Sequence, residues 1–323
     1  MVFHLPFLLQ IVERFPGADI LMGKPLPQEA LRRFYRERPI NDFDDTRQLQ
    51  WLVDTNDRLL QLVELARVIG RPVSISIELD IGMHRGGIAD KEELATVLDT
   101  ARAYNEELNL RGFMGYDAHV PKAPWPRKAE HASKRAKKRY AEMLEFAFTG
   151  WSDLEEGDWC VNGAGSPTIS LHHEESPLND YSVGSALVKP AAFDLPTLEN
   201  FEPAAWIGAP VLKRTSGVKI PFFEKLPSAG RDAVFIYGGK WMAEPCWPEG
   251  LRGNSTYGFS SNQQMLTVPC NSDIAVDDYV FLRPTQSDAV FLQFGDLCVT
   301  RGARHTGNWP VFSNSNYAAG PAR

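Results

Sequence analysis

An unbroken alternation of apolar with small or acidic side chains runs through Val73-Ser74-Ile75-Ser76-Ile77-Glu78-Leu79-Asp80. A period of two is typical of a β-strand, in which successive side chains point to opposite faces of the sheet. A glycine-bearing loop, Ile81-Gly82-Met83-His84-Arg85-Gly86-Gly87, follows at once. In a barrel of βα units, the loop after a strand lies at the rim where active sites form. This stretch therefore predicts an α/β barrel with a candidate site directly after the strand.

Patterns on both sides of this strand favour the same architecture. Residues 48–69 place apolar side chains at helical spacing and end at Gly70, a predicted left-handed cap. Asp90 and Glu93 have the spacing of a capping box at the start of another helix. We expect further strands at residues 18–22, 112–116, 159–162 and 181–188, and further helices at 27–34 and 128–148. Alternating strands and helices predict a parallel sheet or barrel over residues 1–200.

The pattern of residue types along the chain changes near residue 200. Beyond it, short runs rich in Val, Ile, Phe and Tyr are broken by Gly, Pro and Asp, which predicts an all-β domain over residues 201–323. Within it, residues 277–284, 289–294 and 297–299 are predicted strands joined by tight turns. The barrel, in contrast, has about seven predicted strands rather than eight, even with residues 2–5 counted as one.

Composition excludes several classes of protein. The 323 residues carry 34 Lys and Arg against 41 Asp and Glu, a net charge of −7, which disfavours a nucleic-acid partner. No apolar run approaches the roughly 18 residues of a membrane span, so no membrane partner is predicted. The four cysteines are widely spaced, which fits neither a zinc knuckle nor a disulfide framework and predicts a cytoplasmic location.

Polar and small residues gather after the predicted strands. Residues 163–168 and the pair Gly184-Ser185 combine exposed backbone N–H groups with hydroxyls, a pattern that favours phosphate binding. Arg85, Tyr116 and His119 also follow strands and are placed to orient an aromatic cofactor. The pair at residues 172–173 stays unassigned, because adjacent histidines lack the helical spacing that brings two imidazoles to one metal.

Four runs, in order along the chain, resemble the D-threonine aldolase and D-serine dehydratase family: Ile77–Ile88, Tyr116–His119, Gly163–Thr168 and Val183–Ser185. Members of this family are pyridoxal phosphate enzymes with an alanine-racemase-like (β/α)8 barrel of fold type III and a β domain. The resemblance implies pyridoxal 5'-phosphate as cofactor and a small amino-acid substrate. Because a barrel of about seven strands leaves an unpaired parallel edge, we expect poor stability or a homodimer that covers the gap. The resemblance also implies the site residues: Arg85 near the cofactor ring, Tyr116 at the pyridine nitrogen, His119 with Tyr116 in catalysis, and Gly165, Ser166, Thr168, Gly184 and Ser185 at the phosphate.

Two departures from the family pattern shape the expectations. The family's Schiff-base lysine lies on the first barrel strand, and this sequence begins downstream of that segment, so we expect a barrel without its first strand and no covalently held cofactor. Lys24 and Lys240 are interpreted as solvated loop residues. Metal-dependent members carry His-x-Cys or His-x-Asp shortly after a strand ending in proline, whereas Gln286 and Asp288 follow Pro284 here. We therefore assign no metal-ligating residues, and binding of a hard ion such as Mg²⁺ at Asp288 stays open.

The resulting functional hypothesis is a pyridoxal-phosphate enzyme acting on a D-amino acid or hydroxy-amino acid, if the full-length chain supplies the lysine. Lyase reactions of the aldolase or dehydratase kind and racemisation remain open, because all stabilise a carbanion at Cα in the same cofactor. The alternative is a degenerate or truncated homologue that binds pyridoxal phosphate non-covalently without catalysis. A metal hydrolase barrel using His84, His119 and His172 is disfavoured because no ligand spacing supports it.

Overall fold

The computed structural model describes residues 1–124, 128–151, 158–173, 176–219, 222, 230–255 and 257–312. These residues divide into two compact units, one of Met1–Val183 with Phe312 and one of Gly184–Val311. Among the described residues, no helix is both long enough and apolar enough to cross a membrane.

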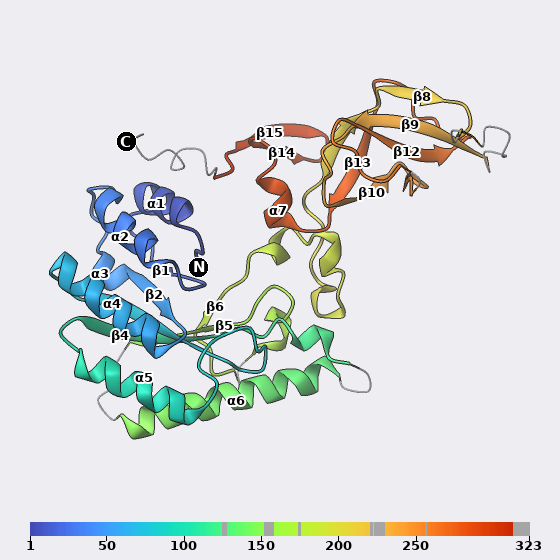
Figure 1. The fold of residues 1–323 in the computed structure, drawn as a ribbon. Helices are drawn as coiled ribbons and strands as arrows, with labels where there is room; N and C mark the ends of the chain where they lie inside the picture. The colour runs from blue at the N-terminus through green and yellow to red at the C-terminus, as the bar shows by residue number, and fades with distance from the viewer. Residues whose placement is uncertain are drawn as a thin grey trace. The chain divides into compact units, whose positions relative to one another are not determined.

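The first unit is built on a parallel half-barrel sheet whose six strands neighbour one another in chain order (Figure 1). The strands are β1 (Ile20–Leu21), β2 (Leu49–Val53), β3 (Val73–Leu79), β4 (Leu108–Gly115), β5 (Cys160–Gly163) and β6 (Asp180–Tyr181). Val2 adds a single parallel bridge to Met22 beyond β1. Since all the ladders are parallel, the carboxyl ends of the strands meet at one edge of the sheet.

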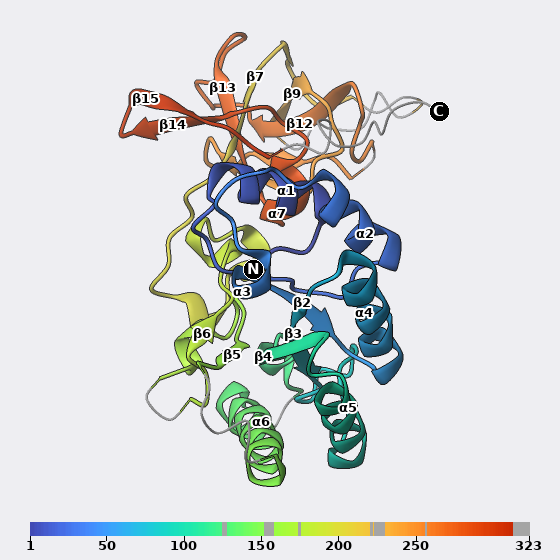
Figure 2. The ribbon, with the colours of Figure 1, turned by 90° about the vertical axis from the view of Figure 1, so that its left-hand side faces the viewer.

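Helices cover the outer face of this sheet, as the turned view shows (Figure 2). They are α1 (Leu5–Arg14), α2 (Gln28–Glu37), α3 (Asp45–Gln48), α4 (Asn56–Ile69), α5 (Lys91–Ala103) and α6 (Ala129–Gly150). The predicted capping box is confirmed, because the Asp90 side chain accepts a hydrogen bond from the Glu93 N–H at 2.9 Å. Gly70 is left-handed with φ 71°, as predicted, and ends α4.

The core of the first unit lies between the sheet and its helices. On β3, Val73, Ile75, Ile77 and Leu79 are all at most 1% exposed and belong to the main apolar cluster. The opposite face of the sheet carries a small separate cluster of Leu21, Leu52 and Met114, against which Tyr116 packs. The alternation in β3 therefore separates a face that packs on helices from a face that turns to the barrel interior.

Three sequence predictions between residues 2 and 188 are wrong in detail. The helix expected over residues 48–69 begins only at Asn56, because residues 49–53 pair with β1 and β3 as strand β2. Residues 2–5 form no strand beyond the bridge at Val2, and helix α1 already begins at Leu5. The strand expected over 181–188 ends at Tyr181, and a 3-10 helix, η4 (Ser185–Leu187), occupies its far end. In all three places pairing or packing overrides the local pattern.

The second unit is mainly antiparallel β-structure. One sheet has the order β10 (Ala243–Trp247), β13 (Tyr279–Pro284), β7 (Ile207–Pro210), and another the order β11 (Arg252–Gly253), β12 (Gln263–Pro269), β9 (Arg231–Tyr237), β8 (Lys213–Thr215). A third ladder joins β14 (Leu297–Arg301) to β15 (Arg304–Trp309). The second unit has its own buried apolar cluster, which includes Val234, Leu266 and Val280.

One strand predicted in the second unit is a helix instead. Residues 289–294 were expected to form a strand, yet the chain forms helix α7 (Ser287–Phe291) there. The Gln293 side chain donates to the Ala289 carbonyl four residues earlier, and Val290 is 1% exposed. An apolar run without alternation fits a buried helical turn as well as a strand, so its periodicity could not separate the two.

Candidate active site at the carboxyl ends of β3, β4 and β5

The loop after β3 is organised by the Asp80 carboxylate. Its Oδ1 accepts hydrogen bonds from the backbone N–H groups of Gly82 (2.9 Å) and His84 (3.0 Å), and its Oδ2 lies 2.6 Å from Nδ1 of His84. Burial by itself would raise the pKa of Asp80, but these donors together lower it below its ordinary value. Gly82 and His84 both have positive φ, 114° and 53°, so the carboxylate holds a tight turn in place.

Arg85, Tyr116 and Gly165 come together from three successive strand ends. The Arg85 guanidinium carbon lies 4.5 Å from the centroid of the Tyr116 ring, a cation–π contact. A Cβ added to Gly165 would lie only 2.8 Å from Cε2 of the same ring, so the β5 loop approaches the ring as closely as a glycine allows. The Arg85 guanidinium therefore stacks on the Tyr116 ring, and the glycine turn after β5 lies beside that ring.

Asp117 joins the loops that follow β4 and β5. Its Oδ1 accepts a hydrogen bond from the Thr168 hydroxyl at 2.6 Å, and its Oδ2 lies 2.9 Å from Nε2 of His172. The Thr168 hydroxyl oxygen in turn accepts a hydrogen bond from the Gly165 N–H at 3.1 Å. Ser176 Oγ lies 2.9 Å from the other His172 ring nitrogen. These buried bonds hold the Gly165–Thr168 turn against the residue that follows Tyr116.

His119 lies on the same loop as Asp117 and faces a neighbouring cleft of about 1000 Å³, which His84 also lines. Its Nδ1 is buried and has no hydrogen-bond partner among the described residues. Burial lowers the pKa of His119, and nearby His84 and Arg135 act in the same direction, whereas Asp117 opposes them. The neutral imidazole is therefore favoured at neutral pH, with a ring nitrogen able to accept a proton.

The predicted site residues of the first unit do not share one hollow. Arg85 and Tyr116 line a small hollow after β3, and His119 lines the larger cleft. Ser166 and Thr168 are buried in the loop after β5, at 7% and 0% exposed. Gly184 and Ser185 belong to the second unit, where the Ser185 hydroxyl lies 2.9 Å from that of Ser287.

Neither lysine considered from the sequence lies among these groups. Lys24 is exposed after β1, with Nζ 5.7 Å from the centroid of the Phe3 ring. Lys240 is an exposed residue of the second unit with φ 50°. Among the described residues, no group of three or more His, Cys, Asp or Glu side chains is arranged to hold a metal ion.

Sequence reasoning gave no role to two carboxyl groups of this site. Asp117 was recognised only as part of the run Tyr116–His119, yet it is the acceptor that joins two rim loops. Glu78 lines the hollow with Arg85, and burial raises its pKa while Arg85 opposes the shift. The position of Glu78 in the sequence could have indicated this role. Glu78 alternates with Leu79 on β3, so its side chain lies on the face of the sheet that turns away from the helices.

The chain has a parallel βα sheet with ionisable groups at the carboxyl ends of its strands, and a separate β unit. These features are typical of the class of barrel proteins whose small-molecule sites lie at this edge. Within this class, the chain belongs to the alanine racemase N-terminal domain family, whose model matches residues 17–191. No curated protein matches the sequence.

Solved structures share the fold. The D-threonine aldolase of Filomicrobium marinum is 18% identical, with a TM-score of 0.71, over 95% of this chain and 79% of the aldolase. The D-threo-3-hydroxyaspartate dehydratase of a Delftia species is 15% identical, with a TM-score of 0.71, over 94% and 82% of the two chains. The alanine racemase of Bacillus anthracis is 16% identical, with a TM-score of 0.62, over 87% and 70%.

Proposed function

We propose that the first unit binds pyridoxal 5'-phosphate at the carboxyl ends of β3, β4 and β5 and takes part in a reaction of a D-amino acid or hydroxy-amino acid. The observation that carries the proposal is the approach of Gly165 to the Tyr116 ring, with Arg85 on that ring. A side chain at residue 165 would collide with the ring, so the glycine lets the backbone of the small-residue turn lie directly beside Tyr116. A cation on an aromatic ring, with an imidazole in the adjoining cleft, is chemistry that suits a phosphorylated pyridine.

The roles we assign follow from these contacts. Arg85 and Tyr116 orient the cofactor ring, and Ser166 with the Gly165 turn binds the phosphate. The hydroxyl of Thr168 is already bonded to Asp117, so its part is to fix the turn. When bound, pyridoxal phosphate supplies an electron sink for a carbanion at Cα. His119, with its lowered pKa, accepts or returns a proton at Nδ1 or Nε2. Gly184, Ser185 and the homodimer stay predictions from the sequence.

A spectroscopic titration tests this proposal. Pyridoxal phosphate is added to the purified chain while its absorbance and fluorescence are followed, and we expect saturable binding by the wild type. Arg85→Leu should weaken binding at least tenfold, because it removes both the charge and the contact with the ring. The control is Arg67→Leu on helix α4, where the guanidinium of Arg67 pairs with Glu107. Equal affinity of the two variants for pyridoxal phosphate would contradict the proposal that the cofactor binds at the carboxyl ends of β3, β4 and β5.

The non-covalent alternative is supported by the exposure of Lys24 and Lys240. Borohydride reduction followed by peptide mapping separates the two hypotheses. A stable pyridoxyl adduct on either lysine would support covalent catalysis by this chain. Saturable binding without an adduct would support a non-covalent binding protein.

A further inference from the structure

A second cleft lies on the helical side of the first unit, between α2 and the end of α4, and encloses about 630 Å³. It is independent of the rim described above, because its residues come from helices and a loop rather than from the strand ends. Four arginines and a tyrosine face three aliphatic side chains across it: Arg32, Tyr35, Arg36, Arg38 and Arg71 against Leu65, Val68 and Ile69.

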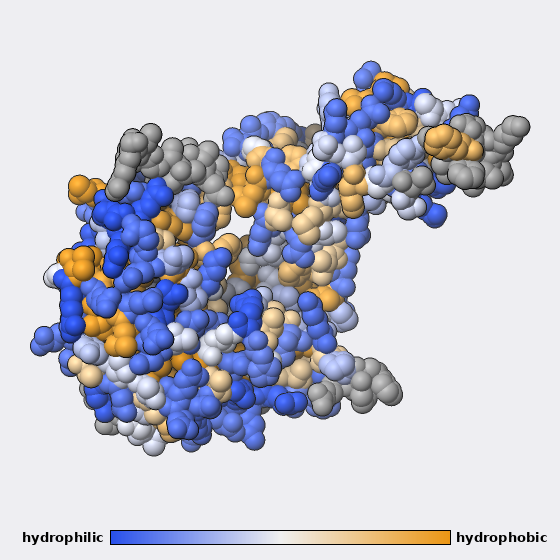
Figure 3. All heavy atoms as spheres, in the orientation of Figure 1, coloured by the Kyte–Doolittle hydropathy of each residue, from blue (hydrophilic) through white to orange (hydrophobic). Residues whose placement is uncertain are grey.

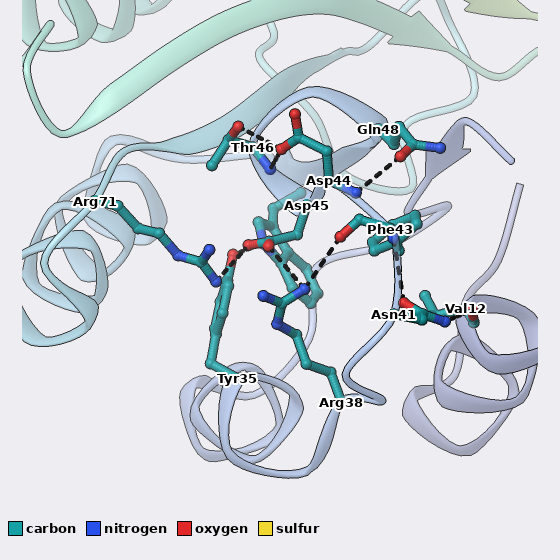
Figure 4. Close-up of polar contacts among 11 residues, drawn as sticks. Val12, Tyr35, Arg38, Asn41, Phe43, Asp44, Asp45, Thr46, Gln48 and Arg71 are labelled. Atoms are coloured by element: carbon teal, nitrogen blue, oxygen red, sulfur yellow. Dashed lines mark hydrogen bonds and ion pairs between the residues drawn. The ribbon is translucent and has the colours of Figure 1, made fainter. Parts of the chain in front are cut away.

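One buried carboxylate fixes two of these arginines. Arg38 reaches Oδ1 of Asp45 and Arg71 reaches Oδ2, each at 3.0 Å, and the Asp45 side chain is only 2% exposed (Figure 4). Arg38 also donates to the Phe43 carbonyl, and the Arg71 guanidinium lies 5.6 Å from the centroid of the Tyr35 ring. The two guanidinium groups are thus held in place before any ligand arrives. Because they share one negative charge, one positive charge stays uncompensated.

The remaining two arginines add to the surplus. Arg36 pairs with Glu29 at 2.7 Å, but both side chains are more than 60% exposed, so water and salt weaken the pair. Arg32, one turn away on α2, lies near the same carboxyl group and lowers its pKa together with Arg36, whose hydrogen bond has the larger effect. Four arginines against Asp45 and Glu29 leave 4 − 2 = 2 positive charges, in a chain whose net charge is −7.

The opposite wall of the cleft is apolar. Val68 is 72% exposed at the end of α4, beside the less exposed Ile69. The face of the first unit visible in Figure 3 is mostly hydrophilic, with apolar side chains in small groups. A single exposed aliphatic side chain does not by itself indicate a binding site. Here, however, Val68 faces fixed guanidinium groups across a cleft of ligand size.

We propose that this cleft binds an organic phosphate, with a dianionic phosphate on the arginines and an apolar body on Val68 and Ile69. Guanidinium groups match phosphate oxygens in paired hydrogen bonds, and a phosphate dianion balances the two surplus charges. The inference does not depend on the function proposed for the rim.

Calorimetric titration of the full chain with phenyl phosphate and with inorganic phosphate, at constant ionic strength, tests the proposal. We expect phenyl phosphate to bind more tightly, and Val68→Ser to abolish that advantage. The double variant R32Q/R36Q should weaken phenyl phosphate binding at least tenfold while leaving Asp45 and its two partners intact. The control R33Q/R67Q removes the same amount of charge, one arginine from α2 and one from α4, at side chains that pair with Glu37 and Glu107 outside the cleft.

Three outcomes would overturn the proposal. The first is no binding of either phosphate by the wild type. The second is an equal loss in the two double variants, which would indicate a general effect of charge. The third is binding only to vesicles that contain phosphatidic acid, which would assign the surface to a lipid headgroup instead of a free phosphate ester.

Discussion

Replacing Thr168 by valine keeps the volume of a fully buried side chain and removes two hydrogen bonds. The variant loses the 2.6 Å bond that the hydroxyl donates to Asp117 and leaves the Gly165 N–H, 3.1 Å away, without its acceptor. A hydrogen bond to a charged group contributes about 1.5–3 kcal/mol, and a buried unsatisfied N–H costs about 1–3 kcal/mol. Because the two losses share one atom, we expect a decrease of about 2–4 kcal/mol in the free energy of unfolding.

Urea unfolding followed by circular dichroism measures this decrease as a lower midpoint with an unchanged slope. Thr96→Val is the matched control, since the Thr96 hydroxyl on α5 is exposed and donates only to the Glu92 carbonyl in the preceding turn. That variant should change stability by less than about 0.5 kcal/mol. If Thr168→Val were equally mild, the bond to Asp117 would not hold the two loops together, and the account of the rim would be wrong.

Four further predictions concern the same edge and its surroundings. Gly165→Ala should destabilise the fold by about 1–3 kcal/mol in urea unfolding, since its Cβ would press on the neighbouring tyrosine ring, while Gly184→Ala, with no atom within 4 Å of the added carbon, should not. Because the folded-state pKa of Asp80 is lowered below 3.8, its stabilisation is present above that pH and lost as the pH falls through the lowered value. The stability difference between wild type and Asp80→Asn should therefore shrink on acidification, and a constant difference would contradict the assignment. NMR titration should place the His119 imidazole midpoint below 6.5. Burial raises the pKa of Cys160 to about 12, so mapping of alkylated peptides at pH 8 should show Cys160 reacting last of the four thiols.

The sequence predicted the βα architecture because its strongest local signals agree with the tertiary structure. The alternation of β3, the capping box at Asp90 and the left-handed Gly70 each satisfy a local rule that packing also needs. Residues 49–53 show the limit, because their apolar spacing suits a helix equally well and only the ladders to β1 and β3 make them a strand. Pairing partners distant in sequence leave no local trace.

The sequence predicted which residues lie at the candidate site, but it did not predict the hydrogen bonds that join them. Arg85, Tyr116 and His119 were chosen because they follow strands, and the structure places all three at the expected edge. The role of Asp117 depends on Thr168 and His172, which lie 51 and 55 residues away along the chain. No spacing rule connects a carboxylate to partners so distant in sequence, so only the three-dimensional structure identifies Asp117 as their common acceptor.

The alternation along β3 also limits how this chain can change by insertion. A slip of one residue in its pairing with β2 or β4 would exchange Ile75 and Ile77 with Ser74 and Ser76, and would turn aliphatic side chains away from the helices. Displacing even one such side chain from a packed interior costs about 1.5–3 kcal/mol, so a single inserted codon within these seven residues would remove much of the stability of a domain. An insertion beside the exposed Ile40, in the loop between α2 and α3, would disturb no ladder. Length variation among homologous chains should therefore collect in that loop and be absent from β3.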